Sequence, residues 1–305
     1  MTRLRCVIPP RVEATRRSRA HRAGRLVLCI ALVLAGCGSA PPSLNPAQQV
    51  ATTASQAAAR SLARGEVAPA RAAYERALAA AESVEDFELA GTALLNLALL
   101  QARSGELTAA HAQLDRILAA PQRYGPALYA GAAARKALVH LDGPDLEAAL
   151  TWADAAQNAC PTPCAHGAAM TTLRAHVALQ RGDAAAAASL AATAVNLAAQ
   201  AGQAAEQANA LRLLGRAHTR AEQTALAVPA LAQALAIDQR LGLPERVALD
   251  LLYAGDNEQR RSNAAAAREF YDRALVVYRA AGMTQAADSV RARLDSLGRA
   301  DSPKR

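Results

Sequence analysis

A repeat of about 40 residues is the feature of this sequence that most constrains its fold. One pattern recurs, with a bulky apolar residue, two mostly polar positions and a small or apolar pair, in YERAL (74–78), LDRIL (114–118), WADAA (152–156), LAQAL (231–235) and YDRAL (271–275). The segment AATAV (191–195) fits with a smaller first residue. The fourth residues are spaced 40, 38, 39, 40 and 40 positions apart: Ala77, Ile117, Ala155, Ala194, Ala234 and Ala274. Such a period predicts an array of similar structural units.

Glycines repeat with the same period. Gly202, Gly242 and Gly282 each follow a helical run, where a left-handed C-cap is expected. A second series pairs glycine with a following acid, which favours the end of one helix and the start of the next: Gly65-Glu66, Gly105-Glu106, Gly143-Pro144-Asp145 and Gly182-Asp183. The body is rich in alanine, and the whole chain has two Phe, one Trp and six Tyr. With almost no β-branched alternation, this composition predicts an all-helical protein with closely packed helices.

The repeats resemble tetratricopeptide repeats. NALRLLGRAHTRAEQTALAVPALAQALAI (209–237) carries Gly215 in its first helix and Ala227, Leu231 and Ala234 in its second. ALLNLALLQARSGELTAAHAQLDRIL (93–118) matches with Ala98 and Ala110 at the corresponding positions. The resemblance implies an all-α, right-handed α-α superhelix of about six helix pairs in residues 50–298. It is completed by a capping helix at 284–298, and residues 299–305 form a polar tail.

The N-terminal segment predicts export and lipidation. Residues 1–25 carry eight arginines and one glutamate, and an apolar run of eleven residues follows, as in a secretory signal peptide (1–36). Leu34-Ala35-Gly36-Cys37 resembles the lipobox of bacterial lipoproteins, which implies cleavage before Cys37 and acylation of that residue. The alternative is a plain secretory signal in which Cys37 is incidental. Residues 37–49 are expected to be the lipidated cysteine and a flexible tether.

The leader also accounts for the basic charge. The chain has 34 Lys and Arg against 26 Asp and Glu, net +8, of which residues 1–36 hold eight and one. The remainder is nearly neutral, so charge gives no general reason to expect nucleic-acid binding.

Gly38-Ser39 lack the aspartate typical of inner-membrane retention in Gram-negative lipoproteins. That resemblance implies a location in the bacterial cell envelope, lipid-anchored at the periplasmic face of the outer membrane.

The sequence predicts neither catalysis nor a cofactor or metal. Its six histidines are scattered, no two stand at ligand spacing, and no phosphate-binding glycine loop is present. Cys160 and Cys164 lie in NACPTPCAHG, a Pro-containing loop, where a disulfide is expected in an oxidising compartment. A metal site with His166 and a pair of free thiols are the other interpretations.

In the tetratricopeptide family the first helices of the pairs line a concave groove that holds extended or helical peptides. Projected onto this chain, the inward face comprises Thr92, Leu95, Asn96, Leu99, Arg103, Ala133, Ala137, His140, Thr172, His176, Asn209, Arg212, Arg216, Arg220, Leu252, Tyr253, Asp256 and Arg260. Arg212, Arg216 and Arg220 are four residues apart, which favours one side of a helix. They predict a partner segment that is acidic or exposes a C-terminus; the alternative is a solvated face paired with Glu206, Asp238 or Glu245.

We therefore expect a non-enzymatic scaffold, anchored to the membrane, that binds a protein or peptide in this groove and acts in assembly or regulation of an envelope complex. The alternative is a periplasmic sensing module whose groove takes a small molecule or a glycan. The scarcity of aromatic residues counts against sugar stacking.

Overall fold

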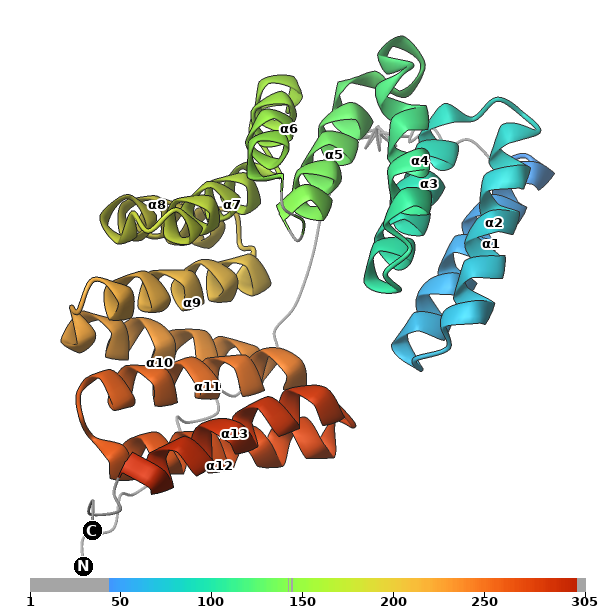
Figure 1. Cartoon of the computed structure of the whole chain (residues 1–305). Coiled ribbons are helices and arrows are strands. Elements are labelled where there is room, and N and C mark those ends of the chain that lie inside the picture. The colour runs from blue at the N-terminus through green and yellow to red at the C-terminus, as the bar shows by residue number, and fades with distance from the viewer. Residues whose placement is uncertain (1–43, 142, 144, 301–305) are drawn as a thin grey trace, which may run out of the picture. The chain divides into compact units, whose positions relative to one another are not determined.

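The computed structural model describes residues 44–141, 143 and 145–300, and for residues 299 and 300 only the backbone. Within these residues the chain forms thirteen helices and no strand (Figure 1). The first seven are α1 (Pro46–Ala63), α2 (Val67–Glu82), α3 (Phe87–Arg103), α4 (Leu107–Leu118), α5 (Pro121–Leu141), α6 (Leu146–Ala159) and α7 (Gly167–Gln180). The others are α8 (Ala184–Gln200), α9 (Ala204–Arg220), α10 (Thr224–Leu241), α11 (Pro244–Arg260), α12 (Ala264–Ala280) and α13 (Thr284–Ala300). The predicted lipidation site, Cys37, lies outside the described residues.

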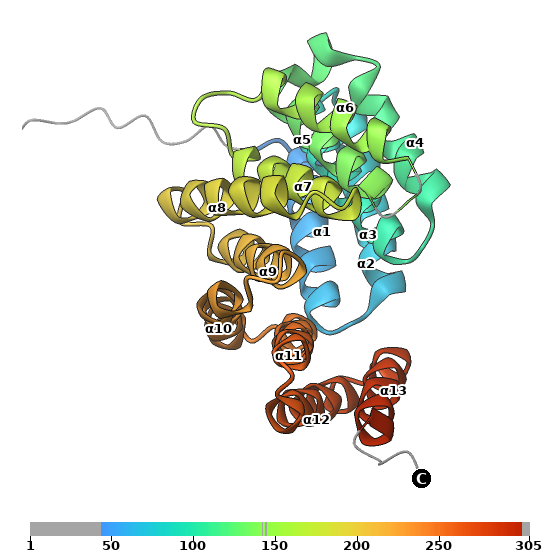
Figure 2. The same cartoon turned by 60° about the vertical axis from the view of Figure 1, so that its left-hand side comes forward.

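Consecutive helices pack as pairs, and each pair packs on the next. The pairs are α1 with α2, α3 with α4, α5 with α6, α7 with α8, α9 with α10 and α11 with α12, and α13 covers α12. Figure 1 shows α7, α9, α10 and α11 as successive layers. Figure 2 views the C-terminal pairs nearly along their axes and places α9 and α11 on one side, with α10 on the other. The predicted helical-repeat solenoid of six pairs and a capping helix is confirmed.

The turns follow the glycine pattern. Gly242 ends α10 in the left-handed conformation (φ 65°, ψ 40°), and Gly202 and Gly282 have similar φ values of 65° and 71°. In the last two pairs the turn after the first helix has no glycine, and Glu222 (φ 60°) and Ser262 (φ 59°) adopt the left-handed conformation instead. The chain therefore keeps the same turn in these pairs at the steric cost of a side chain.

Acidic residues at the starts of helices act differently according to the length of their side chains. Asp145 and Asp183 each accept a hydrogen bond from the backbone N–H three residues later, at Ala148 and Ala186. Glu66 and Glu106 make no such bond at the same positions. The shorter side chain of aspartate reaches the unpaired backbone donors of the first turn, as expected of an N-cap.

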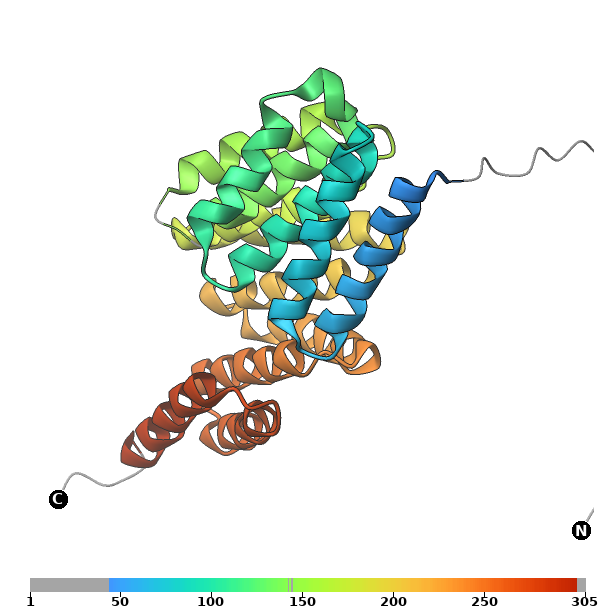
Figure 3. The same ribbon diagram turned by 90° about the vertical axis from the view of Figure 1, so that its right-hand side faces the viewer.

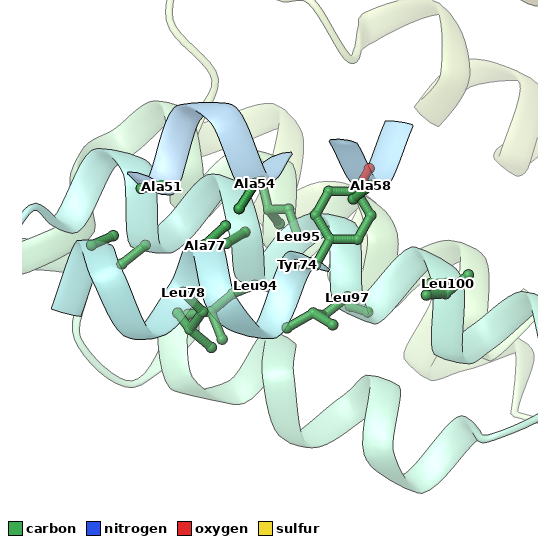
Figure 4. Packing of buried hydrophobic residues seen from close by; sticks show 14 of the residues in the cluster. Ala51, Ala54, Ala58, Tyr74, Ala77, Leu78, Leu94, Leu95, Leu97 and Leu100 are labelled. Atoms are coloured by element: carbon green, nitrogen blue, oxygen red, sulfur yellow. The ribbon is translucent and has the colours of Figure 1, made fainter. Parts of the chain in front are cut away.

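Small residues let the two helices of a pair approach closely. A Cβ added to Gly215 of α9 would lie 2.5 Å from Cγ of Leu231 in α10. A Cβ added to Gly255 of α11 would lie 2.5 Å from Cε1 of Tyr271 in α12. In the N-terminal pairs buried alanines serve the same purpose between larger side chains, as Figure 4 shows for Ala54 and Ala77 near Tyr74. Small residues therefore mark the contacts between the two helices of a pair, in agreement with the close packing predicted from the alanine-rich composition.

The solenoid is longer at both ends than the sequence indicated. α1 begins at Pro46, four residues before the predicted start, because Asn45 and Gln48 form a reciprocal capping box. At the other end α13 runs to Ala300. Its apolar stripe, Ala287, Val290, Leu294 and Leu297, packs in one cluster with α11 and α12, and Figure 3 shows the C-terminal helices against each other.

Candidate functional site

A groove of about 1020 Å³ lies on the first helices of the C-terminal pairs. Helices α7, α9 and α11 form it side by side, and the capping helix α13 adds one side chain. The lining residues are His176, Leu179, Gln180, Arg216, Thr219, Arg220, Tyr253, Asp256, Gln259, Arg260 and Arg293. A single surface thus spans three repeats and the cap.

The groove residues occupy equivalent positions in each repeat. Each first helix has one small residue that faces its second helix: Ala175 in α7, Gly215 in α9 and Gly255 in α11. Counted from it, positions +1, +4 and +5 line the groove: His176, Leu179 and Gln180; Arg216, Thr219 and Arg220; Asp256, Gln259 and Arg260. Close helix contact therefore fixes which side chains the groove receives, since +1, +4 and +5 form one stripe of a helix.

The lining is strongly cationic. It holds four arginines against one acidic residue, Asp256, which accepts a hydrogen bond from Arg293 at 2.9 Å. The Arg216 guanidinium carbon lies 4.6 Å from the centroid of the Tyr253 ring. The Arg220 side chain makes no hydrogen bond or ion pair within the described residues. The nearest carboxylate to Arg260 is that of the exposed Glu222, at 4.0 Å. Several positive charges are thus left without a close internal partner.

No protein-family model matches the chain. No curated protein matches it either. Among solved structures, a Rap protein complexed with competence and sporulation factor is similar at 14% identity, over 83% of this chain and 71% of that one, with a TM-score of 0.58. Aspartyl phosphate phosphatase F from Bacillus subtilis is similar at 11% identity, over 83% of this chain and 80% of that one, with a TM-score of 0.56. The apo form of RapI is similar at 11% identity, over 81% of this chain and 72% of that one, with a TM-score of 0.55.

These likenesses agree with the paired helices and their small-residue contacts. The fold is tetratricopeptide-like. Six residues of the inward face predicted from the sequence line one cavity of this tetratricopeptide-like solenoid: His176, Arg216, Arg220, Tyr253, Asp256 and Arg260. His176 lies 3.2 Å from the Gln180 amide, measured between Nε2 atoms. The sequence did not predict Arg293, because a capping helix is recognised by the apolar face that packs on the last pair and not by the side chains beside that face.

The structure corrects the assignment of Arg212 to the groove. Its side chain is only 10% exposed, and the guanidinium donates to Asp238 of α10 and to Asp250 of α11 (Nε to Oδ1, 2.6 Å). It also donates to Asn209 Oδ1 at 3.0 Å. Asp238, one of the acids considered as a neighbour from the sequence, is fully buried, as is Asp250. Arg212 therefore joins three helices inside the tetratricopeptide-like core.

This buried cluster predicts a pH dependence of stability. Burial raises the pKa of Asp250 from its ordinary 3.8 to about 6, against the opposing charge of Arg212. The folded protein therefore binds this proton more tightly than the unfolded chain, and the contribution to stability is lost as pH rises through the folded-state value. We expect the free energy of unfolding of the wild type, relative to Asp250→Asn, to rise by about 2 kcal/mol between about pH 7.5 and pH 4.5. Urea titrations of both proteins at several pH values measure this difference, and a flat difference would contradict it.

The inward face predicted for α5 is also corrected. Ala133 and Ala137 are fully buried, and the His140 ring packs against the His111 ring of α4 at an angle of 50°, with centroids 4.9 Å apart. The residue of α5 equivalent to Gly215 is Ala137, so the inward position of this helix is Leu138, which is 43% exposed. Burial, followed by the charge of His140, lowers the pKa of His111.

The predicted inward residues Asn96 and Arg103 lie on α3. Asn96 is half-buried and does not line the cationic groove. Arg103 is exposed and lines a smaller, separate pocket between α3, α4 and α5. The sequence predicted one continuous inward face, but the structure places these two side chains in a different part of the solenoid from Arg216.

Cys160 and Cys164 form a disulfide in the structure, with their Cα atoms 5.3 Å apart. It closes the loop between α6 and α7, and Gln203 Nε2 donates to the Ala165 carbonyl from the next repeat. The described residues contain no group of three or more His, Cys, Asp or Glu side chains placed to hold a metal ion. Nor does any helix in the described part of the chain have the length and hydropathy needed to cross a bilayer.

Proposed function

We propose that the chain is a protein-binding scaffold whose cationic groove holds an acidic segment of a partner. The observation that carries this proposal is the groove itself, with four arginines, one carboxylate and room for an extended chain. Charge-assisted hydrogen bonds from arginine to carboxylates are among the stronger polar contacts in proteins. The neighbouring Rap protein, solved with competence and sporulation factor, supports the idea that a solenoid of this kind holds a ligand.

The orientation of the arginines favours a segment over a single small anion. Arg216 and Arg220 are one turn apart on α9, while Arg260 and Arg293 come from α11 and α13. Their positive charges are distributed over three helices, so a ligand with several acidic groups along its length pairs with more of them at once. The arrangement gives electrostatic complementarity and fast association with such a ligand.

Removing two groove arginines should weaken binding of an acidic peptide. The probe is an acetylated, amidated peptide of glutamate and aspartate spaced by glycine, with a neutral fluorophore. Arg216→Ala/Arg220→Ala should raise its Kd by about 30-fold, because two charge-assisted contacts are lost. Fluorescence anisotropy against the full chain in mild detergent gives the Kd, and the effect should shrink as salt is added.

The matched control is Arg240→Ala/Arg279→Ala, which removes the same charge from exposed positions on α10 and α12 outside the groove. It should leave the Kd within about twofold. Equal weakening by both double variants would mean that the peptide responds only to net charge, and the groove would not be the site.

The groove also suits a small polyanion, since its volume of about 1020 Å³ lies near the upper end of small-molecule sites. A di- or tricarboxylate that displaces the peptide at a far lower concentration than simple salt would favour this second function, a sensing module. If the carboxylate displaces the peptide only at the ionic strength at which simple salt also displaces it, the result favours the scaffold function.

The proposal includes a lipid anchor at Cys37, which places the scaffold in the bacterial envelope, at the periplasmic face of the outer membrane. The support is the lipobox-like Leu34-Ala35-Gly36-Cys37 and the Pro- and Ser-containing segment after it. Several acyl chains on one residue give stable membrane attachment.

Cys37→Ser should release the protein from the membrane fraction. Because the anchor requires the thiol, we expect the released fraction to rise by about tenfold or more in cell fractionation. Cys160→Ser serves as the control, since it removes a thiol of the disulfide and leaves the leader unchanged. A Cys37→Ser protein that stays with the membrane would refute lipidation and leave the groove proposal intact.

A further inference from the structure

A second, smaller pocket lies between α3, α4 and α5, apart from the cationic groove. Its volume is about 180 Å³, and its lining is mainly apolar: Ala98, Leu99, Ala102, Arg103, Leu107, Leu114, Arg135, Leu138 and Val139. Three of its leucines, one from each helix, remain partly open to solvent, with 39% of Leu99, 41% of Leu107 and 43% of Leu138 exposed. A cluster of half-exposed leucines around a cavity is typical of a binding site rather than of a scattered surface.

Two arginines of this pocket have no acidic partner. Within the described residues, the only hydrogen bond of the Arg135 side chain is to the Gly131 carbonyl of its own helix, at 3.3 Å. The pocket beside it is lined by apolar side chains and Arg103, His166 also lies near it, and burial lowers the pKa of its guanidinium. Arg103 makes no ion pair within the described part of the chain. A largely buried cation is normally paired, so Arg135 supplies an unmet requirement for a carboxylate.

The pocket faces the same side of the repeats as the cationic groove. Ala98 is the small residue of α3 that corresponds to Gly215 of α9, and Leu99, Ala102 and Arg103 stand at +1, +4 and +5 from it. In α9 these positions belong to the groove residues Arg216, Thr219 and Arg220. Leu138 is the corresponding +1 residue of α5.

We propose that this pocket is a second binding site, which takes a leucine- or valine-sized side chain of a protein segment while Arg135 and Arg103 pair with a carboxylate next to it. The volume admits one branched aliphatic side chain, and the leucines of α3, α4 and α5 supply the apolar surface that it buries. The two guanidinium groups, neither of which has an acidic partner in the described residues, select a segment in which an acidic residue flanks the apolar one. The inference shares with the proposed function only the premise that the ligand is a protein segment.

A photoreactive peptide tests this site without relying on the groove. The probe is acetyl-Gly-Glu-X-Glu-Gly-amide, in which X is a diazirine analogue of leucine, crosslinked to the full chain in mild detergent and mapped by mass spectrometry. Crosslinks should fall on the pocket segments of α3, α4 and α5. An unlabelled peptide with leucine at X should compete about tenfold better than one with alanine, because the larger side chain buries more apolar surface.

Leu138→Asp should reduce the crosslinking yield by about tenfold, because it places a negative charge in the apolar pocket next to the peptide's carboxylates. The matched control is Leu226→Asp, at a leucine of α10 that is 55% exposed and lines neither cavity. It should leave the yield unchanged. Arg135→Gln should abolish the advantage of the acidic peptide over one with glutamine at both glutamate positions.

Crosslinks outside the pocket, no detectable crosslink, or equal yields from Leu138→Asp and the wild type would each overturn the proposal. Arg216→Ala/Arg220→Ala should keep the crosslinking yield at the pocket unchanged while weakening binding of the longer acidic peptide to the groove. The experiments can therefore contradict the groove proposal and the pocket proposal independently.

Discussion

Arg212→Met should lower the free energy of unfolding by about 3–5 kcal/mol, the range found when one member of a buried ion cluster is removed. The guanidinium of Arg212 donates to Asp238 and Asp250, and both carboxylates are fully buried. Without the arginine the folded protein must keep two uncompensated carboxylates or bind protons to neutralise them. Because methionine fills a similar volume, the loss of stability reflects the missing charge more than a cavity. Urea denaturation at neutral pH measures it.

The charge explanation is tested by removing the carboxylates as well. Arg212→Met/Asp238→Asn/Asp250→Asn should recover at least about half of the lost stability, since amides leave no buried charge behind. Arg220→Met, at the exposed end of the same helix, should change stability by less than about 0.5 kcal/mol. A triple variant no more stable than Arg212→Met would show that packing, and not charge, is the contribution of Arg212.

The different positions of Arg212 and Arg220 show the limit of an i, i+4 argument. A helix turns by about 100° per residue, so eight residues place two side chains roughly 80° apart. That rotation is enough to direct Arg212 between α10 and α11 and to leave Arg220 in the groove. The sequence contains the signal that separates them, because Arg216 and Arg220 stand at +1 and +5 from Gly215. Arg212 stands at −3, a position that lines the groove in none of the three repeats.

The pairing of helices could be predicted because each repeated small residue marks a contact that recurs in every unit. The third repeat could not be placed in the same way. Its first helix is rich in alanine, with Ala130, Ala132, Ala133, Ala134 and Ala137 all buried, so composition marks no single face. The helix also includes a break at Gly125 (φ 74°, ψ 169°) followed by Pro126, which shifts its start relative to the other repeats. The predicted inward residues were displaced accordingly.

Gly255→Val should destabilise the protein by about 3 kcal/mol through overpacking. A Cβ at this position would lie 2.5 Å and 2.6 Å from the Cε1 and Cδ1 atoms of Tyr271. Tyr271 is fully buried, and its hydroxyl donates to Asp256 Oδ1 at 2.7 Å, so the ring has no free direction in which to move. Valine must therefore separate α11 from α12 or expel the tyrosine. Thermal and urea unfolding measure the loss.

The control is Gly298→Val on α13, where an added Cβ would meet only the end of the Arg268 side chain, at 3.9 Å. It should change stability by less than about 0.5 kcal/mol. If steric conflict with the ring is the cause, Gly255→Val/Tyr271→Leu should be more stable than the sum of its single changes predicts, because the smaller side chain makes room for valine. Strict additivity would contradict the close contact. Because Asp256 follows Gly255 and accepts from Tyr271, Gly255→Val should also weaken binding of the acidic peptide, so one contact supports both the helix pair and the groove.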